Sequence, residues 1–111
     1  MTTIHTVAAH RKRHALTQEE LAHLLSVSQS AVARLEDDGA AIKLATALAL
    51  QVIFDVQPRL LFRGLYAMIE EVVMARAAEL DRQVRSGTDA ASVKKQRLLA
   101  AMVNRAKAAE A

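Results

Sequence analysis

Apolar residues recur at helical spacing, three or four residues apart, along the first half of the chain. Ile4, Val7 and Ala8 begin this pattern, and the basic run 11–13 closes the first segment, where cations suit the negative end of a helix dipole. Pro58 suits the first position of a short helical turn. The pattern predicts helical segments over residues 3–14, 17–25, 29–37, 41–54 and 58–62.

Two of these helices are short and carry start signals of their own. Residues 17–20 read Thr-Gln-Glu-Glu, a capping box in which Thr17 and Glu20 bond each other's backbone amides. Ser28 is a good N-cap for the helix at 29–37, whose Val32 and Leu35 are expected to point inward. Two short helices joined by a tight turn have the layout of a helix-turn-helix, in which the second helix enters the major groove of DNA.

The second half predicts a helical hairpin over residues 65–109. One apolar stripe runs through 65–84, Gly87 resembles a C-cap, and Thr88 or Asp89 suits the N-cap of a last amphipathic helix. The stripe needs a partner, and two remain open: the rest of the same chain, or a second copy in a dimer. The expected dimer-interface residues are Leu65, Ile69, Val72, Val73, Leu80, Val84, Leu99 and Met102.

Composition narrows the class of protein. Helix-forming residues dominate, whereas glycine occurs three times and proline once in 111 residues, so we expect an all-α fold without a sheet. The chain has no cysteine, which excludes disulfides, thiolate metal sites and cysteine nucleophiles. It also lacks a glycine-rich phosphate loop and a metal-ligand cluster. We therefore expect no enzymatic activity, no metal and no cofactor.

The charge distribution is uneven. Lys and Arg number six against six acidic residues in 1–62, and nine against six in 63–111, so the net charge of +3 lies in the second half. Charge alone thus does not mark the first half as a DNA-binding part. Lys94, Lys95 and Arg97 either touch DNA or form a solvated basic face. No apolar run approaches the roughly 18 residues of a membrane span, and a soluble cytoplasmic protein is expected.

Two histidines, His10 and His14, lie four residues apart on the first predicted helix. This spacing suits metal chelation, but a third ligand is not evident and the neighbouring side chains are cationic. We expect surface histidines near phosphate.

The stretch at residues 16–36, LTQEELAHLLSVSQSAVARLE, resembles the lambda-repressor-like, or Xre-type, family of bacterial and phage regulators. The resemblance runs from about Ile4 to Phe62, and it implies a DNA-binding domain over 1–62. Because that domain is already complete at Phe62 and one recognition helix reads few base pairs, we expect residues 63–111 to form a dimerisation extension. It also implies that Arg11 and Glu36 form a structural ion pair between the first helix and the recognition helix.

The resemblance assigns roles in DNA recognition. Gln18 is expected to hold a phosphate, while Gln29 and Arg34 are suited to bond adenine and guanine bidentately, and Ala33 to contact a thymine methyl. The expected DNA-binding residues are Gln18, Ser28, Gln29, Ser30, Ala33, Arg34 and Lys43.

Two positions and one loop depart from the family pattern. Ser26 and Asp55 stand where relatives often have glycine, so both turns are expected to be altered or strained. The loop at 37–41 reads Asp-Asp-Gly-Ala-Ala where many relatives have basic residues, which leaves Lys43 to contact the DNA backbone. Each lost phosphate contact weakens binding.

These features predict a homodimeric transcriptional regulator, a repressor that binds double-stranded DNA at an inverted repeat. An alternative is an antitoxin-like protein, whose hairpin 65–109 binds a partner protein while the helix-turn-helix regulates its own promoter.

Overall fold

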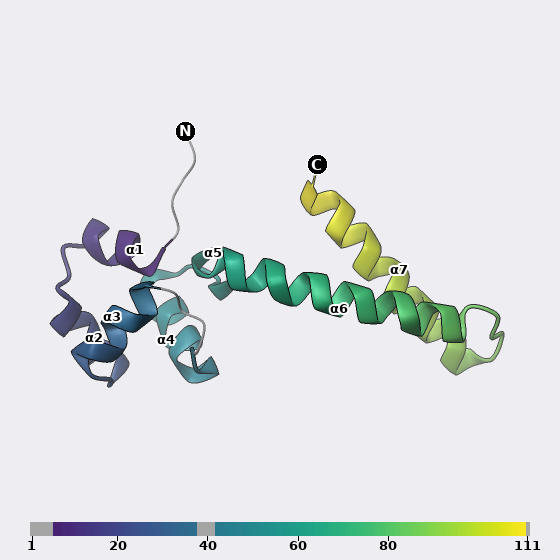
Figure 1. Ribbon diagram of the computed structural model, residues 1–111, viewed down its shortest axis with the longest axis horizontal. Coiled ribbons are helices and arrows are strands. Elements are labelled where there is room, and N and C mark those ends of the chain that lie inside the picture. Colours follow the sequence, from purple (N-terminus) through teal and green to yellow (C-terminus); the bar gives the residue numbers. More distant parts are fainter. Residues whose placement is uncertain (1–5, 38–41, 111) are drawn as a thin grey trace. The chain divides into compact units, whose positions relative to one another are not determined.

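A computed structural model of the protein describes residues 6–37 and 42–110 (Figure 1). Every element of regular secondary structure in these ranges is a helix, which confirms the expected all-α fold. The helices are α1 (Val7–Arg13), α2 (Gln18–Leu25), α3 (Gln29–Asp37), α4 (Leu44–Phe54), α5 (Pro58–Leu61), α6 (Arg63–Val84) and α7 (Ala90–Glu110).

Local capping explains where several helices begin. Thr6 has an extended backbone and its hydroxyl accepts from the Ala9 amide, so α1 begins at Val7 and not at residue 3 as predicted; residues 3–5 lie outside the described part. The capping box is confirmed, since the Thr17 hydroxyl accepts from the Glu20 amide and the Glu20 carboxylate accepts from the Thr17 amide. α4 starts at Leu44, later than predicted, because Lys43 is extended.

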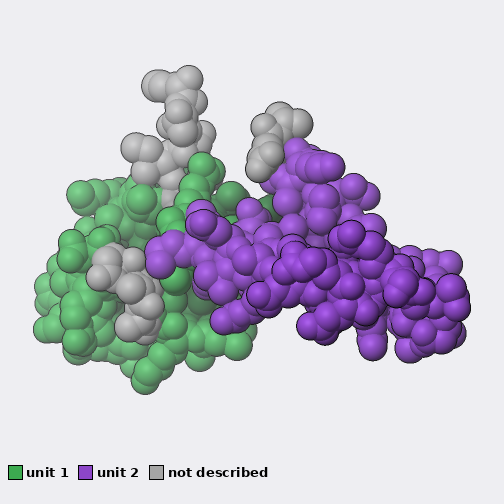
Figure 2. Space-filling model, turned by 45° about the vertical axis from the view of Figure 1, so that its right-hand side comes forward, with its two compact units in different colours: residues 1–66 green, residues 67–111 purple. Residues whose placement is uncertain are grey.

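The chain divides into two compact units, residues 1–66 and 67–111 (Figure 2). The division falls inside α6, which begins at Arg63 and continues from the first unit into the second. The domain bounds of 1–62 and 63–111 stay a prediction. The first unit has a core to which five helices contribute. The buried residues of this core are Val7, Leu21, Ala22, Leu25, Val32, Leu50, Phe54 and Leu61.

The second unit consists of the rest of α6 and of α7. A short turn joins these two helices, and they are in contact. Gln96 of α7 donates its side-chain amide to the carbonyls of Val84, at 2.7 Å, and Gly87, at 2.9 Å, and so satisfies backbone acceptors at the end of α6. Asp89 caps α7 by accepting from the amide and hydroxyl of Ser92. Gly87 is required for space, because a Cβ there would lie 2.6 Å from the Ser92 Cβ.

Candidate nucleic-acid interface

One face of α3 is buried in the core, and this leaves the opposite face exposed to solvent. Val32 is fully buried and Leu35 is half-buried against the core, which fixes the rotation of the helix. With that side inward, the opposite face is exposed to solvent. The exposed residues on this face include Gln29, Ser30, Ala33 and Arg34, and these four were expected to meet base edges.

The turn between α2 and α3 is made without glycine. Ser26 has the left-handed backbone conformation, with φ 56°, and its amide bonds the carbonyl of His23. Asp55 ends α4 in the same way, with φ 53°. These are the two positions at which the resemblance led us to expect altered or strained turns, and both adopt the left-handed conformation that costs a residue with a Cβ energy. Ala15 has φ 58° as well, which sequence reasoning missed because alanine is not a residue that signals this conformation.

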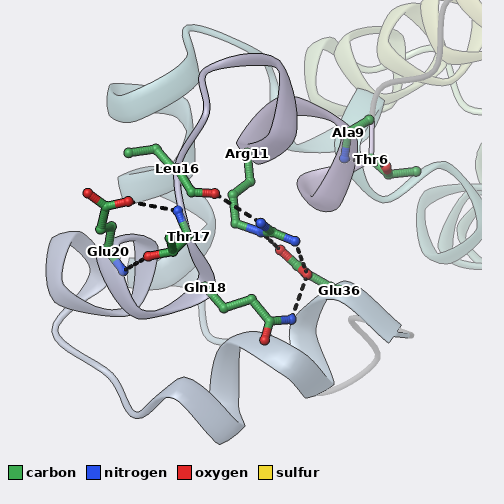
Figure 3. Close-up of polar contacts among 8 residues, drawn as sticks. All are labelled: Thr6, Ala9, Arg11, Leu16, Thr17, Gln18, Glu20 and Glu36. Atoms are coloured by element: carbon green, nitrogen blue, oxygen red, sulfur yellow. Dashed lines mark hydrogen bonds and ion pairs between the residues drawn. The ribbon is translucent and has the colours of Figure 1, made fainter.

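Arg11 and Glu36 are in contact and join α1 to α3 (Figure 3). Arg11 Nε donates to Glu36 Oε2 at 2.6 Å, Nη2 donates to Oε1 at 3.2 Å, and Nη1 donates to the carbonyl of Leu16 at 2.9 Å. The two side chains are only 12% and 9% exposed. Such a two-point contact between a planar guanidinium and a carboxylate restricts the orientation of both helices.

Gln18 belongs to the same network. Its Nε2 donates to Glu36 Oε1 at 3.0 Å, so the residue expected to hold a phosphate also joins α2 to α3 (Figure 3). One amide hydrogen is used in this bond, and the side chain has a second one. The phosphate role of Gln18 stays a prediction, and its bond to Glu36 is a feature that sequence reasoning missed.

The network sets the charge state of Glu36. Burial raises the pKa of this carboxyl, but the hydrogen bonds from Arg11 and Gln18 and the positive charges of Arg11 and Lys12 together lower it by more. The pKa of Glu36 therefore lies below its ordinary value. The pKa of Arg11 is raised, first by its hydrogen bond to Glu36. Both groups are charged at neutral pH.

Two more of the expected DNA-binding residues lie beside helix starts. Ser28 is exposed and its hydroxyl accepts from the Ala31 amide at 3.1 Å, so it caps α3. Lys43 is exposed at the N-cap of α4. Asp37 ends α3 and is exposed, whereas residues 38–41 of the acidic loop lie outside the described part of the chain.

We expected His10 to be a surface residue near phosphate, and this expectation is wrong. It is buried, because α1 packs against the end of α4, and its ring lies 5.5 Å from that of Phe54. His14 is exposed, and its ring stacks on Phe54 at 5.8 Å. The two histidines thus flank one aromatic core residue. Among the residues that the structure describes, no group of three or more His, Cys, Asp or Glu is placed to hold a metal.

A helix-turn-helix family model matches residues 7–61. No curated protein and no solved structure matches the chain. None of the helices in the described ranges is long and apolar enough to cross a membrane. The matched segment runs from the first residue of α1 to the last of α5, and it contains α2, the turn and α3 with its exposed polar face. Residues 7–61 therefore form a DNA-binding helix-turn-helix domain of the lambda-repressor-like, Xre-type family.

Proposed function

We propose that the protein is a sequence-specific transcriptional regulator without enzymatic activity, which binds an inverted repeat as a homodimer and represses transcription. The observation that carries this proposal is the exposed face of α3, where Gln29, Ser30, Ala33 and Arg34 stand on a helix held by a buried opposite side. Gln and Arg are the side chains that read adenine and guanine bidentately in the major groove.

The proposal of a homodimer rests on the apolar face of α6. Ile69, Val72, Val73 and Leu80 share one side of this helix and are between 40% and 53% exposed. Apolar side chains at helical spacing that are left this exposed are typical of an interface. A second copy is the partner that recognition requires, because one recognition helix reads few base pairs and two related by symmetry read two half-sites.

The other expected interface residues have less surface to offer. Leu65, Val84 and Met102 are half-buried in the single chain. Leu99 is already buried, on the same face of α7 as Gln96, whose amide contacts the end of α6. The proposed dimer contact is therefore the exposed apolar face of α6.

Repression requires only that the proposed dimer binds its operator. A dimer that occupies an operator within a promoter blocks access of the polymerase, so the concentration of the dimer sets the level of repression. This mechanism requires no bound effector.

The same apolar face of α6 supports a second candidate, an antitoxin-like protein in which residues 65–109 bind a partner protein. The two proposals differ in solution. A stable homodimer of the purified protein supports the first, whereas a monomer whose hairpin becomes ordered when a partner is added supports the second.

The test of the proposed function is selection of DNA from a pool of random duplexes by the purified full chain, at near-physiological salt so that non-specific attraction is weak. We expect enrichment of an inverted repeat with two short half-sites. Enrichment of a single half-site would contradict the dimer, and enrichment of no sequence would contradict specific recognition and favour the partner-binding candidate.

A further inference from the structure

Positive charge is concentrated on α7, and it has no part in the recognition proposed for α3. Residues 90–110 contain five of the 15 Lys and Arg residues of the chain but one of its 12 acidic residues. By contrast, α6 contains three basic and four acidic residues. The net positive charge of the protein thus lies on its last helix.

Three of these cations share one face of α7. Lys94, Arg97 and Arg105 are separated by three and eight residues, a spacing that places them in one row along a helix. Gln96 and Leu99, which are half-buried and buried, occupy the opposite face. All three cations are exposed. They form a row, here called the basic row of α7, about 16 Å long at the rise of an α-helix.

In the described part of the chain, the basic row has no anionic partner. Among the side chains that the structure describes, ion pairs join Arg11 to Glu36 and Arg85 to Asp81, but no carboxylate pairs with Lys94, Arg97 or Arg105. Like charges held in a row repel one another, which costs stability unless something neutralises them. The row is therefore suited to a polyanion.

The DNA-binding unit lacks a net positive charge of its own that would attract the phosphates of DNA. Residues 1–62 have no net charge, and α3 ends in the exposed acid Asp37. DNA presents one phosphate per about 3.4 Å along each strand, so several phosphates fall within the length of the basic row. A single helix face that carries cations along about 16 Å can meet phosphates at more than one point of this regular charge.

We propose that the basic row of α7 is a second DNA-binding surface, which contacts the phosphate backbone without reading sequence. This inference rests on the proposed function for its biological setting. Recognition by α3 then supplies the choice of operator, and the basic row supplies part of the affinity that the uncharged first half lacks.

The test measures how the affinity of the full chain for a duplex of random sequence depends on salt between about 50 and 200 mM. The variant R97Q/R105Q removes two arginines of the row. The matched control R63Q/R82Q removes two exposed arginines of α6 that no ion pair holds among the described residues. Each variant replaces two arginines by glutamine, so both change the net charge by the same amount. Circular dichroism and the oligomeric state verify that both are folded.

We expect the slope of log K against log salt to fall by about 1.8 in R97Q/R105Q, since each lost phosphate contact removes roughly 0.9, and to change far less in the control. R97K/R105K, which keeps the charges, should keep most of the slope. An unchanged slope in R97Q/R105Q would overturn the inference and leave the row to another partner, such as an acidic protein. Equal losses in both glutamine variants would also overturn it, because bulk charge would then explain the effect.

The random duplex keeps this test separate from that of the proposed function. If selection enriches no sequence but the slope falls only in R97Q/R105Q, the backbone contact stands and specific recognition fails. If an inverted repeat is enriched and the slopes of all variants agree, specific recognition stands and the basic row is not a DNA contact.

Discussion

Arg11 and Glu36 form a two-point ion pair that holds the first helix of the DNA-binding domain to its recognition helix. Their shortest contact is 2.6 Å, between Arg11 Nε and Glu36 Oε2, and Gln18 donates to the other carboxylate oxygen (Figure 3). Side chains from α1, α2 and α3 therefore meet at one carboxylate. This mostly buried contact therefore orients α3, whose exposed face is the proposed DNA-binding surface.

Replacement of Arg11 by alanine should lower the free energy of unfolding by about 3 kcal/mol, because it leaves the Glu36 carboxylate in a mostly buried site without its cation. Urea unfolding measures this change. The control is Arg85→Ala, which breaks the Arg85–Asp81 pair, whose side chains are 70% and 40% exposed. That variant should lose roughly 0.5 kcal/mol or less. Similar losses in both variants would show that the Arg11–Glu36 pair has no special structural role.

The domain should lose stability on acidification, in part because the pKa of Glu36 is lowered in the folded state. The unfolded chain then binds more protons than the folded one at acidic pH. The contribution of Glu36 is fully present above its unfolded pKa of roughly 4.3 and is lost as pH falls through the lower folded pKa. Unfolding midpoints between about pH 7 and pH 3 should show a shallower dependence for Glu36→Gln than for the parent protein. Parallel curves would contradict this role of Glu36.

The two glycines at Gly64 and Gly87 should respond to alanine in opposite directions. A Cβ at Gly87 meets Ser92, whose amide and hydroxyl bond the capping residue Asp89, so Gly87→Ala should cost about 1–3 kcal/mol through overpacking. A Cβ at Gly64 meets nothing within 4 Å and lies in the first turn of α6, so Gly64→Ala should stabilise by about 0.5 kcal/mol. Thermal unfolding of both variants provides the comparison, and stabilisation by Gly87→Ala would contradict the tight turn.

Arg34 on the outward face of α3 should determine one base in each half-site. Arg34→Ala should relax preference at that position and cost on the order of 1–3 kcal/mol per site on the selected operator. Arg34→Lys is the control, because it keeps the charge and loses the planar fork that reads guanine. It should keep the salt dependence and lose the base preference. An equal loss of affinity on operator and random DNA for Arg34→Ala would assign Arg34 to the backbone instead.

The exposed apolar face of α6 should carry dimerisation. Val72→Glu places a charge in the middle of that face. Because burying an unpaired charge is costly, this variant should be a monomer at micromolar concentration. Sedimentation equilibrium measures the change. Val52 of α4 is 85% exposed, and Val52→Glu serves as the matched control that should stay dimeric. Dissociation by Val52→Glu alone would move the interface to α4.

Much of the first unit could be predicted from the sequence because its signals are local. The capping box at Thr17 and Glu20 and the cap at Ser28 depend on residues three apart, and the structure places α2 and α3 next to them. The burial of Val32 follows from helical periodicity within α3 itself. The family pattern extends this local information, since it also names the distant pair Arg11 and Glu36.

Other features depend on which surfaces meet. His10 has the polar ring and cationic neighbours of a surface residue, and it is buried because α1 packs on Phe54. Gln18 bonds Glu36, a residue far along the chain, because α2 and α3 bring the two together. Gly87 is needed because Ser92 approaches it, and not for a left-handed cap.

The sequence by itself determined the helices, the turn between α2 and α3, and the family of the first domain, because periodicity, capping and motif spacing act over a few residues. The tertiary structure decided which side chains are buried, which carboxylate joins three helices, and which apolar face of α6 stays exposed. Those outcomes depend on how helices pack against one another, and packing is a property of surfaces that residues distant in the chain form together.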